Sequence, residues 1–226
     1  FGTILAAYYA KRMGLPVNKL ICASNSNNVL TDFLKTGVYD RNRPFYTTVS
    51  PSMDILISSN LERLLYALSG ENDAQVADYM AQLNASGRYE VSEDIKEQIR
   101  DLFAAGFTTE DETEETIGKM WQEKQYLIDT HSAVAFHVLE QYRRETGDNT
   151  VSVVASTASP FKFGDAVLKA IGVQDVKSGV ALLDQLSEAS GIPAPTPLAA
   201  LKTKTPRFDQ CVEKENMEQA VLGFLN

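Results

Sequence analysis

The chain has 226 residues, 44% of them hydrophobic, so it can bury a full core in one large domain without disulfide bonds. Its formal net charge is −9, from 21 Lys and Arg against 30 Asp and Glu, and no basic run occurs, so nucleic acid is not an expected partner. With only two cysteines, Cys22 and Cys211, and two histidines, we expect a reducing cytoplasm, no disulfide framework and no metal site. No apolar run approaches the roughly 20 residues of a membrane-spanning helix.

The first 70 residues alternate helices with short apolar strands. The chain opens at Phe1 without a Met, and we interpret it as a piece of a longer protein. The predicted elements are a helix at 3–13, a strand at 19–23, a helix to about residue 35, a strand at 45–49, and helices from about 53 and from 60 to 68. This order of strand, polar turn and helix is typical of crossover units in a mainly parallel sheet.

The middle of the chain, about 72–124, is acidic and is predicted to be a helical insertion. Its helices are expected at 73–83, 92–105 and 109–123. The acidic run 110–115 indicates a solvated helix start, because acidic side chains favour the first turn of a helix. The predicted fold class is therefore α/β, with a mainly parallel sheet flanked by helices and an acidic helical insertion.

Hydroxyl side chains follow the most apolar strand candidate of the second half. A helix at 130–146 precedes a β-branched run at 151–155, which ends at Ser156, Thr157 and Ser159. Ligands of open parallel sheets bind beyond the carboxyl ends of strands, so these hydroxyls could meet a ring or a phosphate. They could equally cap the helical stretch predicted at 161–171. Further helices are expected near 177–190 and 214–225, joined by a proline-rich connector.

Three other polar positions have both a functional and a structural interpretation. Gly2 opens a helix, whose N-terminus either binds phosphate or is a plain helix start. Asn25 and Asn27 follow a strand and either bond the edge of a planar ligand or form a self-bonded turn. His131 begins a helix and is either a neutral donor or acceptor, or a buried and satisfied histidine. No nucleophile elbow and no complete glycine phosphate loop occurs in the sequence.

Several blocks resemble one family in their order and spacing. They are Phe1-Gly2 and the stretches 6–16, 25–37, 50–55, 58–63, 128–134 and 156–163. Together they are similar to threonine synthase, a fold type II pyridoxal-phosphate enzyme, and they correspond to its C-terminal half. The resemblance covers essentially the whole chain, so residues 1–226 are expected to form the C-terminal portion of the catalytic domain.

The resemblance implies an activity and a cofactor. The family converts O-phospho-L-homoserine and water into L-threonine and phosphate, with pyridoxal 5'-phosphate as an electron sink. Its cofactor phosphate is held by a Ser/Thr-Gly-Asn-Phe-Gly loop, of which Phe1 and Gly2 are the last two residues. The hydroxyl of Thr157 matches the one that bonds the pyridine nitrogen.

The same resemblance implies roles for five other residues. Asn25 and Asn27 are expected on the cofactor side of the site, and His131 and Ser156 on the substrate side. Lys162 is expected to bind the substrate anion, or to lie at a solvent-facing helix start.

The family's Schiff-base lysine precedes the glycine loop, in sequence that this chain does not contain, so no catalytic residue is assigned here. The chain alone is expected to be inactive, to need the N-terminal half as a partner, and to leave an exposed strand edge that favours self-association. The sequence leaves two alternatives open. One is another fold type II pyridoxal-phosphate lyase, such as a threonine dehydratase relative, which would lack the block at 51–54. The other is a non-catalytic binding fragment.

Overall fold

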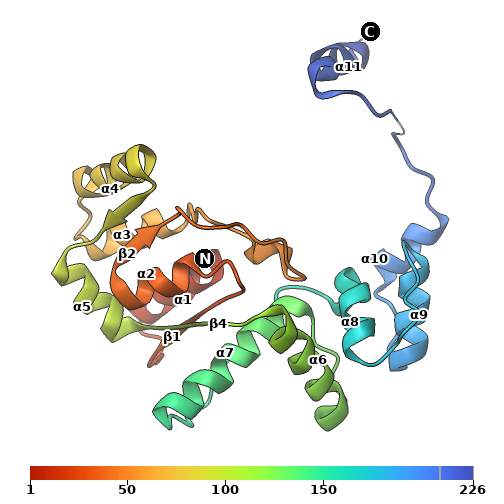
Figure 1. Cartoon of the computed structure of the whole chain (residues 1–226), viewed down its shortest axis with the longest axis horizontal. Coiled ribbons are helices and arrows are strands. Elements are labelled where there is room, and N and C mark those ends of the chain that lie inside the picture. Colours follow the sequence, from red (N-terminus) through yellow and green to blue (C-terminus); the bar gives the residue numbers. More distant parts are fainter. Residues whose placement is uncertain (209, 226) are drawn as a thin grey trace.

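The computed structural model describes residues 1–208 and 210–225, and Figure 1 shows its arrangement. The helices are α1 (Gly2–Arg12), α2 (Val29–Thr36), α3 (Leu61–Leu68), α4 (Asp73–Ser86), α5 (Glu93–Leu102), α6 (Glu110–Lys124), α7 (Thr130–Thr146), α8 (Gly164–Ala170), α9 (Ala181–Ser190), α10 (Thr196–Ala199) and α11 (Met217–Gly223). The strands are β1 (Leu20–Ser24), β2 (Val38–Asp40), β3 (Arg88–Glu90) and β4 (Phe103–Phe107). Short 3₁₀ helices lie at Pro51–Met53, Pro160–Phe163, Ala200–Thr203 and Lys214–Asn216.

The parallel sheet consists of β1 and β4, paired in register from Leu20 opposite Phe103 to Ser24 opposite Phe107. Helices α2 and α7 pack against both strands. Thr31 of α2 ties its helix to the sheet, because its hydroxyl donates to the carbonyl of Gly106 at 2.8 Å. The predicted α/β class, with helices flanking a parallel sheet, is confirmed.

Two separate hydrophobic cores support this frame. The larger core gathers side chains from α1 to α5 and the strands, including Phe33, Leu64 and Ile95. The smaller core lies among α6, α8 and α9 and includes Ile117 and Leu168. Figure 1 shows the corresponding groups of helices on opposite sides of α7.

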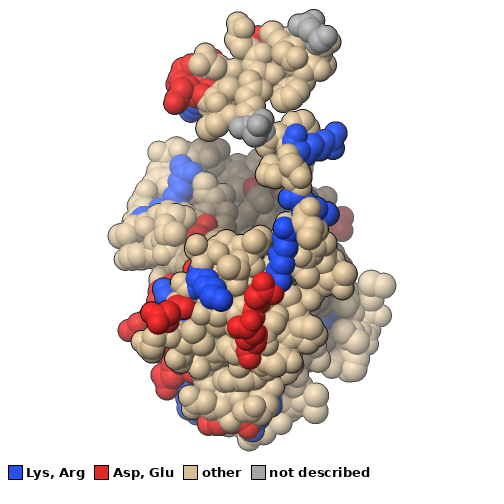
Figure 2. Space-filling model, turned by 90° about the vertical axis from the view of Figure 1, so that its right-hand side faces the viewer, with Lys and Arg blue, Asp and Glu red and all other residues tan. Residues whose placement is uncertain are grey.

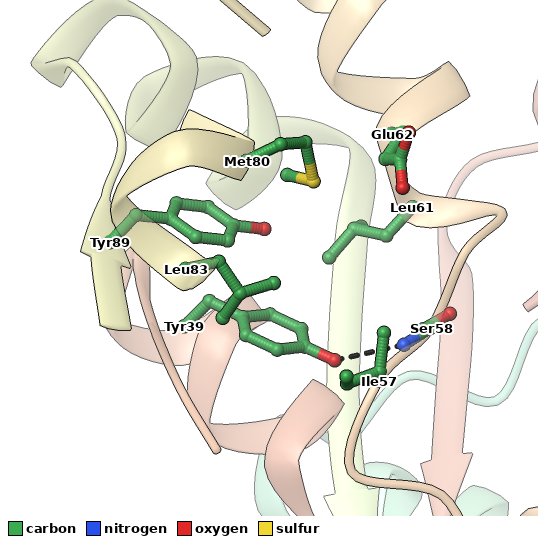
Figure 3. Close-up of a pocket in the computed structure, with 8 residues that line it drawn as sticks. All are labelled: Tyr39, Ile57, Ser58, Leu61, Glu62, Met80, Leu83 and Tyr89. Carbon is green, nitrogen blue, oxygen red and sulfur yellow. Dashed lines mark hydrogen bonds between the residues drawn. The ribbon is translucent and has the colours of Figure 1, made fainter. Parts of the chain in front are cut away.

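The antiparallel pair β2–β3 forms a small sheet of its own beside α4. Tyr39 and Tyr89, which are opposite one another in this pair, stack with ring centroids 5.3 Å apart. A small cavity beside them is lined also by Ser58, Leu61 and Met80, and Figure 3 shows the Tyr39 hydroxyl accepting from the Ser58 amide at 3.0 Å. Because this cavity is walled mostly by core side chains, we regard it as a packing gap.

The acidic run at the start of α6 behaves as predicted. Thr109 and Glu112 form a capping box, in which each side chain accepts from the other residue's backbone amide. The hydrogen bond from the Thr109 amide lowers the pKa of Glu112 below its ordinary value. Glu110, the first residue of the run, also contacts another segment: its carboxylate accepts a hydrogen bond from the Val49 amide at 2.8 Å.

The helix predicted at 92–105 is wrong at its C-terminal end. Helix α5 stops at Leu102, and the chain continues directly as β4, the partner of β1. Region 72–124 therefore contributes a strand to the sheet as well as helices, and β3 lies within it too. The Ala-Ala pair of β4 favours a helix locally, but pairing with β1 overrides that preference.

Two predicted strands are absent from the described residues. Residues 45–49 form a loop, because Asn27, Asp54 and Glu110 side chains accept hydrogen bonds from its backbone amides. Residues 151–155 are not paired with any strand, and Val151 and Val153 are 96% and 94% exposed. A strand needs a neighbour for its backbone groups, and no described segment supplies one here.

The C-terminal segment extends away from the body of the molecule and carries α11 at its end (Figure 1). Phe208 and Phe224 contact one another there, with ring centroids 5.7 Å apart. Figure 2 shows basic and acidic side chains interspersed among large uncharged areas on the side that carries this segment. None of the helices in the described part of the chain combines the length and apolar character needed to cross a membrane.

Candidate functional site

The polar turn after β1 is held by a dense hydrogen-bond network. Asn25 is fully buried, and its amide nitrogen lies 2.8 Å from Thr48 Oγ1, 3.0 Å from Ser50 Oγ and 2.8 Å from Asp54 Oδ1. Its amide oxygen accepts from the Asn27 backbone amide at 3.0 Å. This last bond is the self-bonded turn that the residue types predicted.

Asn27 fastens the same turn to the loop 45–49. Its amide nitrogen donates to the Tyr46 carbonyl at 2.8 Å and to Asp54 Oδ1 at 3.0 Å, and its amide oxygen accepts from the Tyr46 amide at 2.9 Å. The Asp54 carboxylate is therefore the acceptor that both asparagines share. Because protein acceptors engage both amide nitrogens, a ligand acceptor could bond these nitrogens only by replacing those partners.

His131 lies in the first turn of α7 and is 4% exposed. Its Nε2 accepts from the Ser52 backbone amide at 3.2 Å, and its Nδ1 lies 3.3 Å from both Thr130 Oγ1 and Asp129 Oδ1. An acceptor at Nε2 requires a lone pair there, so the proton of the neutral ring is on Nδ1. The imidazole also packs on Phe163, with ring centroids 4.7 Å apart.

Asp129 caps α7 and is buried beneath His131. Its Oδ1 accepts from the backbone amides of His131 and Ser132, and its Oδ2 accepts from the Ser132 hydroxyl. Burial by itself disfavours the charged form, but the hydrogen bonds from His131 and Ser132 outweigh it and lower the pKa of Asp129. The carboxylate is therefore the form that the surroundings stabilise.

The hydroxyl segment after residue 155 connects to α7 at one point. Ser156 Oγ lies 3.0 Å from Ser132 Oγ, whereas Thr157 is exposed and makes no hydrogen bond among the described residues. Ser159 accepts from the Phe161 amide at 3.3 Å and so caps the 3₁₀ helix Pro160–Phe163. Lys162 is exposed on that helix. The capping interpretation therefore holds for Ser159, while Thr157 keeps a free hydroxyl.

Phe1 and Gly2 lie at the start of α1. The Phe1 side chain makes no capping hydrogen bond, and its ring lies 6.4 Å from the ring of Phe103. A Cβ atom added at Gly2 would come within 3.4 Å of the Asn60 side chain, so α3 begins next to this helix end. Neither Gly2 nor Thr157 lines the cavity of Figure 3 or the open groove along α6, whose lining includes Asp111, Glu114 and Ala170.

The structure thus joins four of the eight predicted site residues through intermediates that the sequence analysis missed. The Asn25–Asn27 turn reaches His131 through Ser50 and Ser52, and His131 reaches Ser156 through Asp129 and Ser132. Asp129 could have been found from sequence, because an Asp just before a helix is a capping signal. Asp54 had no comparable local signal. The described residues contain no group of His, Cys, Asp and Glu that could hold a metal ion.

Chemically, the connected residues offer amides, hydroxyls, an imidazole and two carboxylates, of which Asp129 is buried and Asp54 is half-buried. These groups bind and orient a polar ligand, but the network holds no lysine that could bond covalently to an aldehyde. Lys162 is the cation closest along the chain to the free Thr157 hydroxyl. The arrangement is that of a binding wall.

Comparisons with known proteins agree on one family. The family model described as "Threonine synthase, C-terminal" matches residues 132–221. Threonine synthase from Saccharomyces cerevisiae is 40% identical over 185 residues, which cover 76% of this chain and 36% of the yeast protein. Threonine synthase from Pseudomonas aeruginosa is 38% identical over 170 residues, covering 75% of this chain and 36% of that protein.

Two solved structures extend the agreement to the fold. A crystal structure of threonine synthase from yeast superposes with a TM-score of 0.84 at 34% identity, covering 100% of this chain and 45% of that one. The chain matches a threonine synthase C-terminal half. A PLP-bound threonine synthase from Brucella melitensis gives a TM-score of 0.80 at 39% identity, covering 98% of this chain and 43% of that one. The chain spans about a third of the length of the curated threonine synthases that it matches.

Proposed function

We propose that this chain is the C-terminal half of a cytoplasmic threonine synthase. Together with an N-terminal half it converts O-phospho-L-homoserine and water into L-threonine and phosphate. The observation that carries the proposal is the superposition of the entire chain on a yeast threonine synthase, supported by 40% identity to threonine synthase from S. cerevisiae over 185 residues. The reaction class is a pyridoxal-phosphate-dependent elimination of phosphate from carbon.

The residues present fit pyridoxal 5'-phosphate at two points. The first turn of α1 lacks a side-chain cap, so its backbone amides are available for the cofactor phosphate next to Phe1 and Gly2. The Thr157 hydroxyl has no partner in the described chain and can bond the pyridine nitrogen. When bound, the cofactor supplies an electron sink for the negative charge that proton loss leaves on substrate carbon.

The other predicted residues form the wall around that ring in this proposal. Asn25 and Asn27 act on the cofactor side by fixing the turn after β1, since their amides are engaged by the protein. His131 and Ser156 border the substrate side, and Lys162 attracts the substrate phosphate. A neutral hydroxyl at Thr157 does not by itself protonate the pyridine nitrogen, which favours controlled elimination over side reactions.

The missing Schiff-base lysine makes the isolated chain inactive in this proposal. The test compares the purified chain with a protein in which it is joined to the N-terminal portion of S. cerevisiae threonine synthase. With pyridoxal phosphate and O-phospho-L-homoserine, the joined protein should show the absorbance of a lysine-bound cofactor and form threonine. The chain alone should do neither. Threonine formation by the chain alone would refute its inactivity, and an inactive but folded joined protein would refute the assigned reaction.

A single substitution tests the role of Thr157 in the joined protein. Thr157→Val keeps the shape of the side chain and removes the hydroxyl, which leaves a buried ligand atom without a partner. Such a loss costs about 1–3 kcal/mol, so threonine formation should fall by roughly five- to 150-fold. Ser159→Ala serves as the control, because Ser159 caps a 3₁₀ helix and is proposed to make no ligand contact. If both substitutions changed threonine formation equally, the proposed contact between Thr157 and the cofactor would be wrong.

A further inference from the structure

The buried carboxylate of Asp129 makes more contacts than a helix cap requires. It is 1% exposed, and capping is satisfied by its bonds to the His131 and Ser132 amides, at 2.9 Å and 3.3 Å. The same carboxylate also contacts two side chains, the His131 ring at Nδ1 and the Ser132 hydroxyl. Each of these side chains reaches a different segment of the molecule.

The first branch runs through His131 to the 3₁₀ helix Pro51–Met53. Asp129 Oδ1 lies 3.3 Å from Nδ1, and Nε2 accepts from the Ser52 amide at 3.2 Å. A carboxylate beside Nδ1 favours the proton on that nitrogen, which leaves the Nε2 lone pair free for Ser52. The position of the charge therefore decides which tautomer holds the 51–53 segment.

The second branch runs through Ser132 to Ser156. The Ser132 hydroxyl has two acceptors within hydrogen-bond distance, Asp129 Oδ2 and Ser156 Oγ, the latter at 3.0 Å. Its single proton therefore lies between the buried carboxylate and the Ser156 oxygen. Through Ser132 the carboxylate is linked to a segment that it does not itself touch.

We propose that Asp129 is a positioning residue that, through His131 and Ser132, holds the Pro51–Met53 segment and the Ser156–Thr157 segment in one fixed arrangement. The proposal rests on the proposed function, which places His131 and Ser156 beside the substrate and Thr157 beside the cofactor ring; Ser52 of the first segment contacts His131. Its tests use backbone and ring measurements on the chain itself, so they stand independently of any assay of threonine formation.

The main experiment uses Asp129→Asn in the full 226-residue chain. Asn caps helices as well as Asp does, so α7 should persist while the charge is lost. Amide hydrogen exchange at Ser52 should become at least about tenfold faster, since its acceptor is no longer held in one tautomer. The order parameters of the Ser156 and Thr157 amides, from nitrogen-15 relaxation, should fall from the rigid range, about 0.85, toward the flexible range, below about 0.6.

Ser132→Ala separates the two branches. It keeps the carboxylate and the cap but deletes the link to Ser156. Mobility should rise at residues 156 and 157, while exchange at Ser52 stays as in the parent chain. Asn72→Asp is the matched control, because it swaps the same two residue types at the cap of α4, where the Asn72 side chain accepts only from Gln75 N at 3.0 Å. It should change neither segment.

Two results would overturn the proposal. Asp129→Asn with both segments unchanged would make Asp129 a helix cap and nothing more. The second result concerns the tautomer of His131, which nitrogen-15 correlation spectra of the ring would measure. The spectra would be recorded in a His137→Gln variant, because that substitution leaves His131 as the one histidine of the chain. A proton found on Nε2 would exclude the bond from Ser52 and with it the first branch.

Discussion

At the residue scale, the two cysteines differ sharply in their surroundings. Cys22 is buried in β1, and burial raises the pKa of its thiol to about 12. Cys211 is exposed in the C-terminal segment. Thiolate is the reactive form of cysteine, and at pH 8 a thiol with a pKa near 12 is thiolate in only about one molecule in ten thousand.

Alkylation should therefore distinguish the two cysteines. Iodoacetamide at pH 8 is expected to add one group to the folded chain, at Cys211, and a second only after denaturation. Intact-mass spectrometry and peptide mapping measure both events. A Cys211→Ser variant should remain unlabelled while folded. Rapid labelling of that variant would mean that β1 is open to solvent, contrary to its packing between α2 and α7.

The surroundings also decide the roles of the polar residues of the site. Asn25 and His131 each had two interpretations from sequence, and tertiary contacts decide how their polar atoms are used. Asn25 bonds to Thr48, Ser50 and Asp54, and His131 bonds to Ser52, which is 79 positions away along the chain. No local pattern contains information about partners at such separations.

At the scale of elements, the contact between α6 and α8 depends on one glycine. Gly118 is buried in α6, and a Cβ atom there would lie 2.7 Å from the carbonyl oxygen of Ala170. Gly118→Ala should stabilise the chain by about 1 kcal/mol through higher helix propensity. The added methyl group, however, would clash with the Ala170 backbone and push α6 and α8 apart, which costs about 1–3 kcal/mol. We expect net destabilisation, seen as a melting temperature lower by a few degrees in circular dichroism.

Gly223→Ala is the matched control for this substitution. Gly223 is also helical, in α11, but no neighbouring heavy atom lies within 4 Å of an added Cβ. The added methyl group should therefore leave the melting temperature unchanged or raise it slightly. A Gly118→Ala chain as stable as the parent would show that α8 can move away at no cost.

At the scale of the whole molecule, segment 151–155 is the most conspicuous exposed feature. Val151 and Val153 are almost fully exposed, the run is apolar and rich in β-branched residues, and it pairs with no strand among the described residues. In the proposed threonine synthase it would pair with a strand of the N-terminal half. Without that half, unpaired strand-like segments are sites of association between chains.

We therefore propose that the isolated chain associates with itself as its concentration rises. Small-angle scattering should give an apparent mass above that of the 24.9 kDa monomer at high concentration. Val151→Lys together with Val153→Lys should lower that mass, because charges on an edge oppose pairing. Val180→Lys, at an exposed position before α9, should not. A parent chain that stays monomeric throughout would count against an open edge.

The sequence by itself determined the α/β class, most helices and the family resemblance, because these depend on apolar periodicity, capping residues and short motifs that are local in the chain. Only the tertiary structure decided that β4 follows α5 without a break, that 45–49 is a loop, and that 151–155 stays unpaired. Strands differ from helices in this respect, since the hydrogen-bond partners of a strand lie on another segment. The β1–β4 pair joins residues about 83 positions apart, as in Leu20 opposite Phe103. The same reason explains why Asp129 and Asp54 emerged as the shared acceptors of the site only in three dimensions.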